Sequence, residues 1–334
     1  MVRRSSAFTM KPDLKISFAG VEFANPVLVA SGTFNYGLEM ARFYPLSKLG
    51  GIVTKSITLK ARPGHPYPRT YETKGGMLNA IGLANPGIEK FLSKKMPFLR
   101  ALGTRLVVNI AGSTIEEFVE LAQRLSDVEG IDALEVNISC PNVKEGGLEF
   151  SATPQPAFRV LSAVRKATRL PLVAKLSPNT ADIAAIAQAA EEAGMEGVSL
   201  INTLVGMAVD LKTNKPILSN VTGGLSGPAI KPVALAMVYT VARRVKIPVM
   251  AIGGICGATD ALEFMVCGAT LVQVGTANFT DPKAAPKVVD GIESYLKEQK
   301  ISSVQNLVGA LRVPPEKESS PIKLPKLDEL RVQT

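Results

Sequence analysis

Short apolar runs alternate with longer segments of helical spacing eight times along this chain, and this alternation constrains the possible folds more than any other feature. The runs predicted as strands span residues 26–31, 51–56, 106–111, 133–139, 172–177, 197–203, 248–254 and 271–276. The predicted helices span residues 38–49, 87–102, 114–126, 156–168, 180–193, 231–245, 259–267 and 284–297. Each run reads as buried on both faces, which is typical of a parallel sheet covered by helices. Eight consecutive units of this size predict an α/β protein with a (β/α)8, or TIM, barrel rather than an open doubly wound sheet.

Two segments do not fit the alternation. Residues 58–86 form a long Gly/Pro-rich insertion between the second strand and its helix. A loop of that length inside a compact domain is usually a lid or a substrate loop. Residues 313–334 are rich in Pro, Lys and Glu, and we expect an extended or flexible C-terminal tail there. Because no linker divides the rest, we expect residues 1–312 to form a single domain.

The composition excludes several classes of protein. The longest apolar runs, such as residues 248–252, are too short to span a bilayer, and the basic opening lacks the apolar stretch of a secretory signal. We therefore expect a cytoplasmic protein that does not enter a membrane. Three cysteines without a CxxC pair argue against a disulfide framework, a metal site or an iron–sulfur cluster held by this chain alone. The formal net charge of +9 suits RNA, an acidic subunit or anionic small molecules equally well.

A thiol between two carboxamides follows the fourth predicted strand. Asn137 ends the strand, and Cys140, Pro141 and Asn142 form the turn after it. Barrel enzymes carry their chemistry at the carboxyl ends of the strands, and amides that both donate and accept hydrogen bonds suit a flat, polar heterocycle. Taken alone, such a turn can equally well satisfy only its own backbone. Asn109 and Asn202 supply further carboxamides at the ends of the third and sixth strands.

Lysines and glycines close other strands of the predicted barrel. Lys55 and Lys175 end the second and fifth strands, where a lysine must direct its ammonium group to a polar site or to solvent. One such cation could stabilise a reduced flavin, which is negatively charged near N1 and the C2 oxygen, and the other could bind a substrate carboxylate. Gly253 and Gly254, together with Gly275, predict a phosphate cup at the seventh and eighth strands, although a Gly pair can also form a simple tight turn.

Together these motifs resemble the class 1 dihydroorotate dehydrogenases, from about residue 14 to residue 311. The matching motifs are Ala30-Ser31-Gly32, Lys55-Ser56, Asn79-Ala80-Ile81-Gly82-Leu83, Asn137 to Asn142, Lys175-Leu176-Ser177, Ile201-Asn202-Thr203, Gly253-Gly254 and Gly275-Thr276. Residues 143–147 are similar to subclass 1B, the catalytic FMN subunit, whereas fumarate-using subclass 1A typically has a Pro-Gly-Lys-Pro-Gln-like stretch there. The cysteine at position 140 also differs from the serine base of the membrane-attached class 2.

The resemblance implies an enzyme that oxidises (S)-dihydroorotate to orotate in de novo pyrimidine (UMP) biosynthesis. A hydride would pass from C6 to N5 of FMN, and Cys140 would act as the general base that takes the proton from C5. One FMN per subunit is expected to be held by Ser31, Lys55, Ser56, Asn109, Asn137, Lys175, Ile201, Gly227, Gly253, Gly254, Gly275 and Thr276. Dihydroorotate is expected to be held by Lys55, Asn79, Ala80, Ile81, Gly82, Leu83, Asn137, Asn202 and Thr203.

The resemblance also implies a partner. In subclass 1B, electrons leave through a second subunit that carries FAD and a [2Fe-2S] cluster and reduces NAD. The implied assembly is a heterotetramer of two catalytic and two electron-transfer subunits around a homodimer of this chain, without nucleic acid. The shortage of cysteines in this chain agrees with that division of cofactors.

Several alternatives stay open at this point. A related FMN barrel could reduce uracil or thymine, or uridines in tRNA, although little of the chain remains for an RNA domain after the eighth helix. A fumarate-dependent class 1A enzyme and a catalytically silent scaffold are the others. We expect Cys256 and Cys267 to be buried and inert, and His65 to have a surface or packing role.

Overall fold

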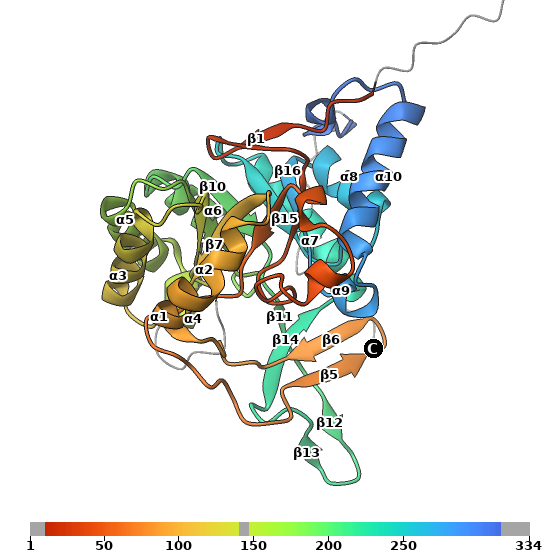
Figure 1. Cartoon of the computed structure of the whole chain (residues 1–334). Helices are drawn as coiled ribbons and strands as arrows, with labels where there is room; N and C mark the ends of the chain where they lie inside the picture. Colours follow the sequence, from red (N-terminus) through yellow and green to blue (C-terminus); the bar gives the residue numbers. More distant parts are fainter. Residues whose placement is uncertain (1–10, 140–146, 315–334) are drawn as a thin grey trace, which may run out of the picture.

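Eight parallel strands close into a barrel in the computed structural model, which describes residues 11–139 and 147–314 (Figure 1). The barrel strands are β3 (Val27–Val29), β4 (Gly51–Val53), β7 (Arg105–Ile110), β8 (Ala133–Asn137), β9 (Leu172–Lys175), β10 (Gly197–Leu200), β15 (Val249–Ile252) and β16 (Ala269–Val274). Each strand pairs with the next one in this series, and β16 pairs with β3 to close the ring. The predicted α/β fold and (β/α)8 barrel are confirmed.

Most predicted strands run past the observed carboxyl ends. Some of these final residues still bond to a neighbouring barrel strand, as the N–H of Thr54 does to the carbonyl oxygen of Val107 at 3.0 Å, and others bond to other segments. The backbone N–H of Lys55, for example, donates to the carbonyl oxygen of Asn35 at 2.9 Å. These residues therefore form the rim on which the site is built.

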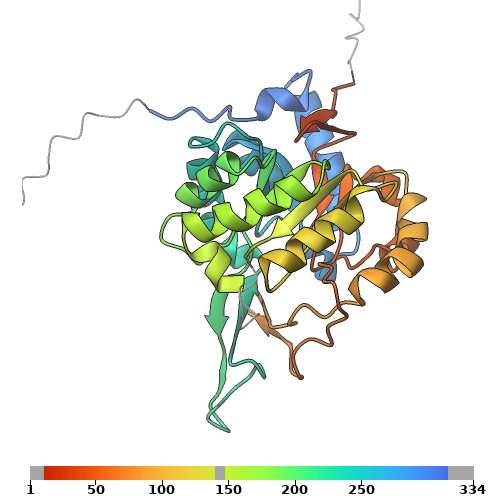
Figure 2. The same ribbon diagram turned by 90° about the vertical axis from the view of Figure 1, so that its left-hand side faces the viewer.

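Helices cover the outside of the barrel (Figure 2). They are α1 (Gly87–Lys90), α2 (Met96–Arg100), α3 (Ile115–Ser126), α4 (Gly147–Ala152), α5 (Pro154–Ala167), α6 (Ile183–Glu192), α7 (Lys231–Ala242), α8 (Ala258–Val266) and α10 (Ala284–Glu298). The short helix α9 (Ala277–Thr280) lies at the carboxyl ends of the strands. The π-helical turn η3 (Phe91–Lys95) joins α1 to α2, whose second residue, Pro97, lacks the N–H for a regular helical bond. Short turns are η4 (Pro228–Ile230) and η5 (Val304–Leu307).

One predicted helix is wrong. Residues 38–49 form only two 3-10 turns, η1 (Met40–Arg42) and η2 (Leu46–Lys48). Pro45 separates them in an extended conformation, with ψ of 119°. Proline has no N–H and disfavours the helical conformation of the residue before it, so the apolar spacing alone could not sustain a helix.

A hairpin covers the amino-terminal end of the barrel. It consists of β1 (Ile16–Phe18) and β2 (Val21–Phe23), which pair antiparallel. Phe18 is 2% exposed and lies against Gly197, the first residue of β10, where a β-carbon would come within 2.7 Å of the ring. This end of the barrel is therefore filled by apolar side chains, and the opposite end remains for a site.

A small antiparallel sheet lies at that opposite end (Figure 1). Its strands, in order, are β11 (Leu204–Met207), β14 (Thr222–Ser226), β6 (Gly76–Asn79) and β5 (Thr70–Thr73), and the hairpin β12 (Val209–Asp210) and β13 (Lys215–Pro216) projects beyond it. The predicted insertion at 58–86 is thus partly sheet, and a second insertion, residues 204–230 after the sixth barrel strand, was missed. Strand β6 pairs with a segment far away in the sequence, so tertiary contacts decide its conformation.

The small sheet has a core of its own, which leads to a first prediction. Leu78 is 2% exposed and packs with Ala80 and Leu218, apart from the main barrel core. Because removing a buried leucine costs at least about 2 kcal/mol, Leu78→Ala should speed amide exchange in β6 and β14 by about 30-fold. Hydrogen exchange followed by mass spectrometry measures this. Met207→Ala, at a half-exposed position of the same sheet, is the control, and equal exchange in both variants would contradict the prediction.

The described part of the chain contains no helix long and apolar enough to cross a bilayer. The predicted tail, residues 313–334, lies outside the described residues except for its first two positions. Cys140, Pro141 and Asn142 also lie outside them.

Candidate active site

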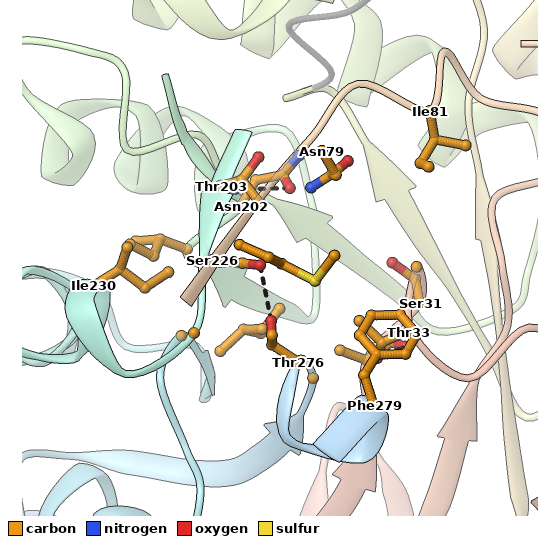
Figure 3. Close-up of a pocket in the computed structure, with 18 of the residues that line it drawn as sticks. Ser31, Thr33, Asn79, Ile81, Asn202, Thr203, Ser226, Ile230, Thr276 and Phe279 are labelled. Carbon is orange, nitrogen blue, oxygen red and sulfur yellow. Dashed lines mark hydrogen bonds between the residues drawn. The ribbon is translucent and has the colours of Figure 1, made fainter. Parts of the chain in front are cut away.

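A cavity opens at the carboxyl ends of the barrel strands, between the barrel and the small sheet (Figure 3). The structure brings most of the predicted site residues to its wall: Ser31, Lys55, Ser56, Asn79, Ile81, Gly82, Leu83, Asn137, Lys175, Ile201, Asn202, Thr203, Gly227, Gly253, Gly254, Gly275 and Thr276. Asn109 and Ala80 are fully buried and do not line the cavity. Residues from seven barrel strands or the turns after them thus meet at one place, as the barrel topology predicts.

Lys175 is the buried cation of this cavity. Its side chain extends from the last position of β9 and is 5% exposed. The ammonium Nζ donates to Ser31 Oγ at 3.0 Å and lies 3.5 Å from Glu135 Oε1. A buried lysine needs such polar partners, since an isolated charge in an apolar interior is costly.

Glu135 is a functional candidate that the sequence analysis missed. It lies in β8 with no exposed surface and contacts Lys175 from inside the barrel. The available signal was its place within the otherwise apolar run 133–136, because a glutamate is almost never fully buried unless it is paired.

Lys55 provides a second cation from the turn after β4. Burial, together with the positive charge of the nearby Arg69, lowers the pKa of Lys55 below its ordinary value of 10.5. Lys55 and Lys175 both line the cavity.

Carboxamides fix the strand end that leads to Cys140. The Oδ1 atom of Asn137 accepts hydrogen bonds from the backbone N–H of Ser139 at 3.3 Å and from its hydroxyl at 2.9 Å. From the turn after β10, two strands away from β8 in the barrel, Asn202 Nδ2 donates to the carbonyl oxygen and the hydroxyl of Ser139 at 3.1 and 2.8 Å. The residue directly before Cys140 is therefore held by two side chains that line the cavity.

Glycines form the wall after β15. Gly253 and Gly254 have φ of 130° and 75°, conformations that favour glycine. A β-carbon at Gly253 would lie 2.8 Å from Ala234 Cβ, and one at Gly254 would lie 2.6 Å from Lys231 Cβ. Only glycine fits between α7 and the cavity here, which brings the main chain itself to the cavity wall.

The small sheet closes the cavity from the other side. Thr276 Oγ1, just after β16, donates to Ser226 Oγ of β14 at 2.8 Å, as Figure 3 shows. Asn79 Nδ2 donates to the carbonyl oxygen of Gly224 at 3.2 Å, which fixes the β6 end of the sheet. Further lining residues that the sequence analysis missed are Thr33, Thr70, Met77, Ser226, Ile230 and Phe279. Most of these come from the small sheet or short helical turns, where no barrel pattern could indicate them.

The remaining cysteines and the histidine can now be placed. Cys256 is exposed and lines the cavity, and Cys267 is partly exposed, so the prediction that both are buried is wrong. Cys256 follows the Gly253–Gly254 turn, which leads the chain out of the barrel core. Burial raises the pKa of both thiols, and Asp260 adds to the rise at Cys256, which supports the predicted lack of reactivity. His65 has the predicted packing role, with Nδ1 lying 3.2 Å from the carbonyl oxygen of Ala80.

Comparison with known proteins agrees with this geometry. The family model of dihydroorotate dehydrogenase matches residues 13–296. The chain is thus a barrel oxidoreductase and belongs to the dihydroorotate dehydrogenase family, whose members depend on a flavin. A solved structure of DHODH from Eimeria tenella in complex with ferulenol has the same fold, with a TM-score of 0.75, 22% identity and coverage of 92% of this chain and 91% of that one.

Within the family, the chain is similar to proteins named dihydroorotate dehydrogenase B (NAD(+)), catalytic subunit. The relative from Pelobacter propionicus is 56% identical over 302 residues, which cover 90% of this chain and 99% of the relative. The relative from Geobacter metallireducens is 55% identical over 303 residues, 91% of this chain and 99% of the relative. The predicted resemblance to subclass 1B is confirmed.

Proposed function

We propose that this chain is a catalytic subunit that oxidises (S)-dihydroorotate to orotate with FMN, and that its electrons leave for NAD through a partner subunit. The observation that carries the proposal is the meeting of Lys55, Lys175, Asn137 and the Gly253–Gly254 turn at one cavity. A flat heterocycle with a phosphate tail and a small anionic substrate both need such a combination of cations, carboxamides and exposed main chain. The product is a precursor of pyrimidine nucleotides.

The residues present fit FMN. Gly253 and Gly254 allow close approach to the main chain, which suits a phosphate group, and Thr276 supplies a hydroxyl beside them. Buried Lys175 and its partner Ser31 suit the electron-rich edge of an isoalloxazine ring. When bound, FMN supplies the acceptor for the hydride that leaves C6 of dihydroorotate.

The chain's own residues would handle the substrate and the proton. Lys55 would bind the carboxylate of dihydroorotate, while Asn79, Asn137, Asn202 and Thr203 would bind its ring amides. Cys140 follows directly on Ser139, which Asn137 and Asn202 hold, and would take the proton from C5 as the hydride leaves. The small sheet would cover the substrate and exclude water. Asn109 is fully buried, so its side chain would have to reorient on binding to contact the cofactor.

The partner is supported by the names of the relatives. They are called catalytic subunits of an NAD(+) enzyme, a name that implies a second subunit. We propose that FAD and a [2Fe-2S] cluster reside on that second subunit, in a heterotetramer built on a homodimer of this chain.

The alternatives are less well supported. Uracil and thymine have no carboxylate for Lys55, and the names of the relatives favour the NAD-linked subclass 1B over the fumarate-linked subclass 1A. The basic charge that suggested tRNA serves the anionic substrate and cofactor equally well.

Anaerobic titration of the purified chain with dihydroorotate tests the proposal. Bleaching of the flavin absorbance is the expected result, followed by slow or absent reoxidation with NAD until the partner subunit is added. A chain with bound FMN that dihydroorotate does not bleach would contradict the proposal, and uracil and tRNA would then be offered in turn.

The lowered pKa of Lys55 predicts a pH dependence of substrate binding. The ammonium group loses its proton as pH rises through a pKa below 10.5, and its attraction for the substrate carboxylate is then lost. The KM for dihydroorotate should therefore be constant at lower pH and rise in the alkaline range. Steady-state kinetics with the partner subunit measures it. In Lys55→Arg the guanidinium stays charged, so a KM that still rose with pH in this variant would contradict the prediction.

A further inference from the structure

A carboxylate inside the barrel has no part in the function proposed above. The two oxygens of Glu135 accept hydrogen bonds from Asn109 Nδ2 at 2.6 Å, Ser199 Oγ at 2.8 Å and Gln273 Nε2 at 2.9 Å, and Oε1 lies 3.5 Å from Lys175 Nζ. These partners come from β7, β10, β16 and β9, so one side chain connects five of the eight barrel strands. Burying a carboxylate costs desolvation free energy, and the hydrogen bonds from these donors offset that cost.

The carboxylate determines how its amide neighbours are oriented. Because it only accepts hydrogen bonds, Asn109 and Gln273 must turn their NH2 groups toward it. Their oxygens, Asn109 Oδ1 and Gln273 Oε1, are then buried without a hydrogen-bond partner among the described residues. A buried polar atom without a hydrogen-bond partner lowers the stability of the fold, so stability alone does not account for this arrangement.

Lys175 connects the hydrogen-bond network of Glu135 to the cavity. Its ammonium group is held between Ser31 Oγ, which lines the cavity, and Glu135 Oε1 on the inner side. A lysine side chain is flexible, and these two contacts define one position for its charge. The negative charge at 3.5 Å also offsets part of the positive field that Lys175 exerts on a bound molecule.

We propose that Glu135 is a positioning residue of the flavin site, which fixes the ammonium group of Lys175 and offsets part of its charge. The inference rests on the proposed function, because it concerns a ligand whose charge changes on reduction. Reduced flavin is negatively charged near N1 and the C2 oxygen, so a Lys175 without its counter-charge would favour the reduced form.

The midpoint potential of the flavin in the holoenzyme, measured by equilibration with a reference dye, tests the inference. Glu135→Gln keeps the size of the side chain and removes its charge. The hydroxyl of Ser199 and the amide of Gln273 can each turn so that they accept a hydrogen bond from the new NH2 group. The ammonium group of Lys175 can only donate, so it cannot adapt in this way. The reduced flavin should then be favoured over the oxidised form about tenfold more than in the unchanged protein, which is about 30 mV for a two-electron couple.

Ser199→Ala is the matched control, since it removes one donor to the same carboxylate without changing any charge, and its potential should equal that of the unchanged protein. Glu135→Asp retains the charge at a greater distance from Lys175 and should give an intermediate flavin potential. This variant also tests the inference if Glu135→Gln does not retain its flavin. A potential that is unchanged or lower in the Glu135 variants, or equally raised in Ser199→Ala, would overturn the inference. The proposed function fails separately, if dihydroorotate does not reduce the flavin of the unchanged protein.

Discussion

Cys140→Ala should slow the reduction of bound flavin by dihydroorotate by about 10²- to 10⁴-fold, the range that a general base usually contributes. The flavin should stay bound, because the described contacts of its proposed site do not depend on this thiol. Anaerobic stopped-flow absorbance measures the rate in a single turnover, without the partner subunit. The prediction depends on the strand end at Asn137, Ser139 and Asn202, whose hydrogen bonds position the residue that precedes Cys140.

The unchanged protein should show a matching pH profile. A thiol takes a proton from carbon only as its thiolate, so the reduction rate should rise with pH. Cys256→Ala is a matched control, because it removes a thiol that lines the cavity. The flavin reduction rate and the pH profile of Cys256→Ala should equal those of the unchanged protein. A Cys140→Ala variant that is reduced at the normal rate would rule out the proposed base.

Gly254→Ala should weaken flavin binding at least about tenfold. Alanine pays about 1–2 kcal/mol to adopt the φ of 75° found there, and its β-carbon would lie 2.6 Å from Lys231 Cβ and 2.8 Å from Lys231 N. A free-energy difference of about 1.4 kcal/mol corresponds to a factor of ten in affinity. A displaced Gly253–Gly254 turn is therefore sufficient to weaken flavin binding tenfold. The change in flavin fluorescence on titration of the apoprotein measures the dissociation constant.

Gly257→Ala provides the control for this variant. Gly257 lies three residues further along, has an extended φ of −152°, and a β-carbon there would meet nothing within 4 Å. Its flavin affinity should therefore match that of the unchanged protein. Equal affinities in all three proteins would show that the Gly253–Gly254 turn does not contribute to the cofactor site.

Much of the barrel and its rim could be predicted from local sequence. Strands such as 172–175 are apolar on both faces, and lysine or asparagine at their ends indicates where polar side chains meet. The glycines at 253–254 were noticed because they follow the seventh strand, where barrels commonly bind phosphate, although a Gly pair alone can also form a tight turn. The failed helix at 38–49 shows the limit of apolar spacing, because one proline outweighed it.

The sequence by itself determined the eight-fold alternation, the family, and the chemical groups at the strand ends, because each of these depends on residues that are neighbours in the chain. Only the tertiary structure decided that Gly76–Asn79 pairs with Thr222–Ser226 to cover the cavity, that Cys256 emerges at its wall, and that Glu135 holds Lys175. These features depend on contacts between distant segments. Strand pairing and burial in these segments depend on how the barrel closes, so no local sequence pattern predicts them.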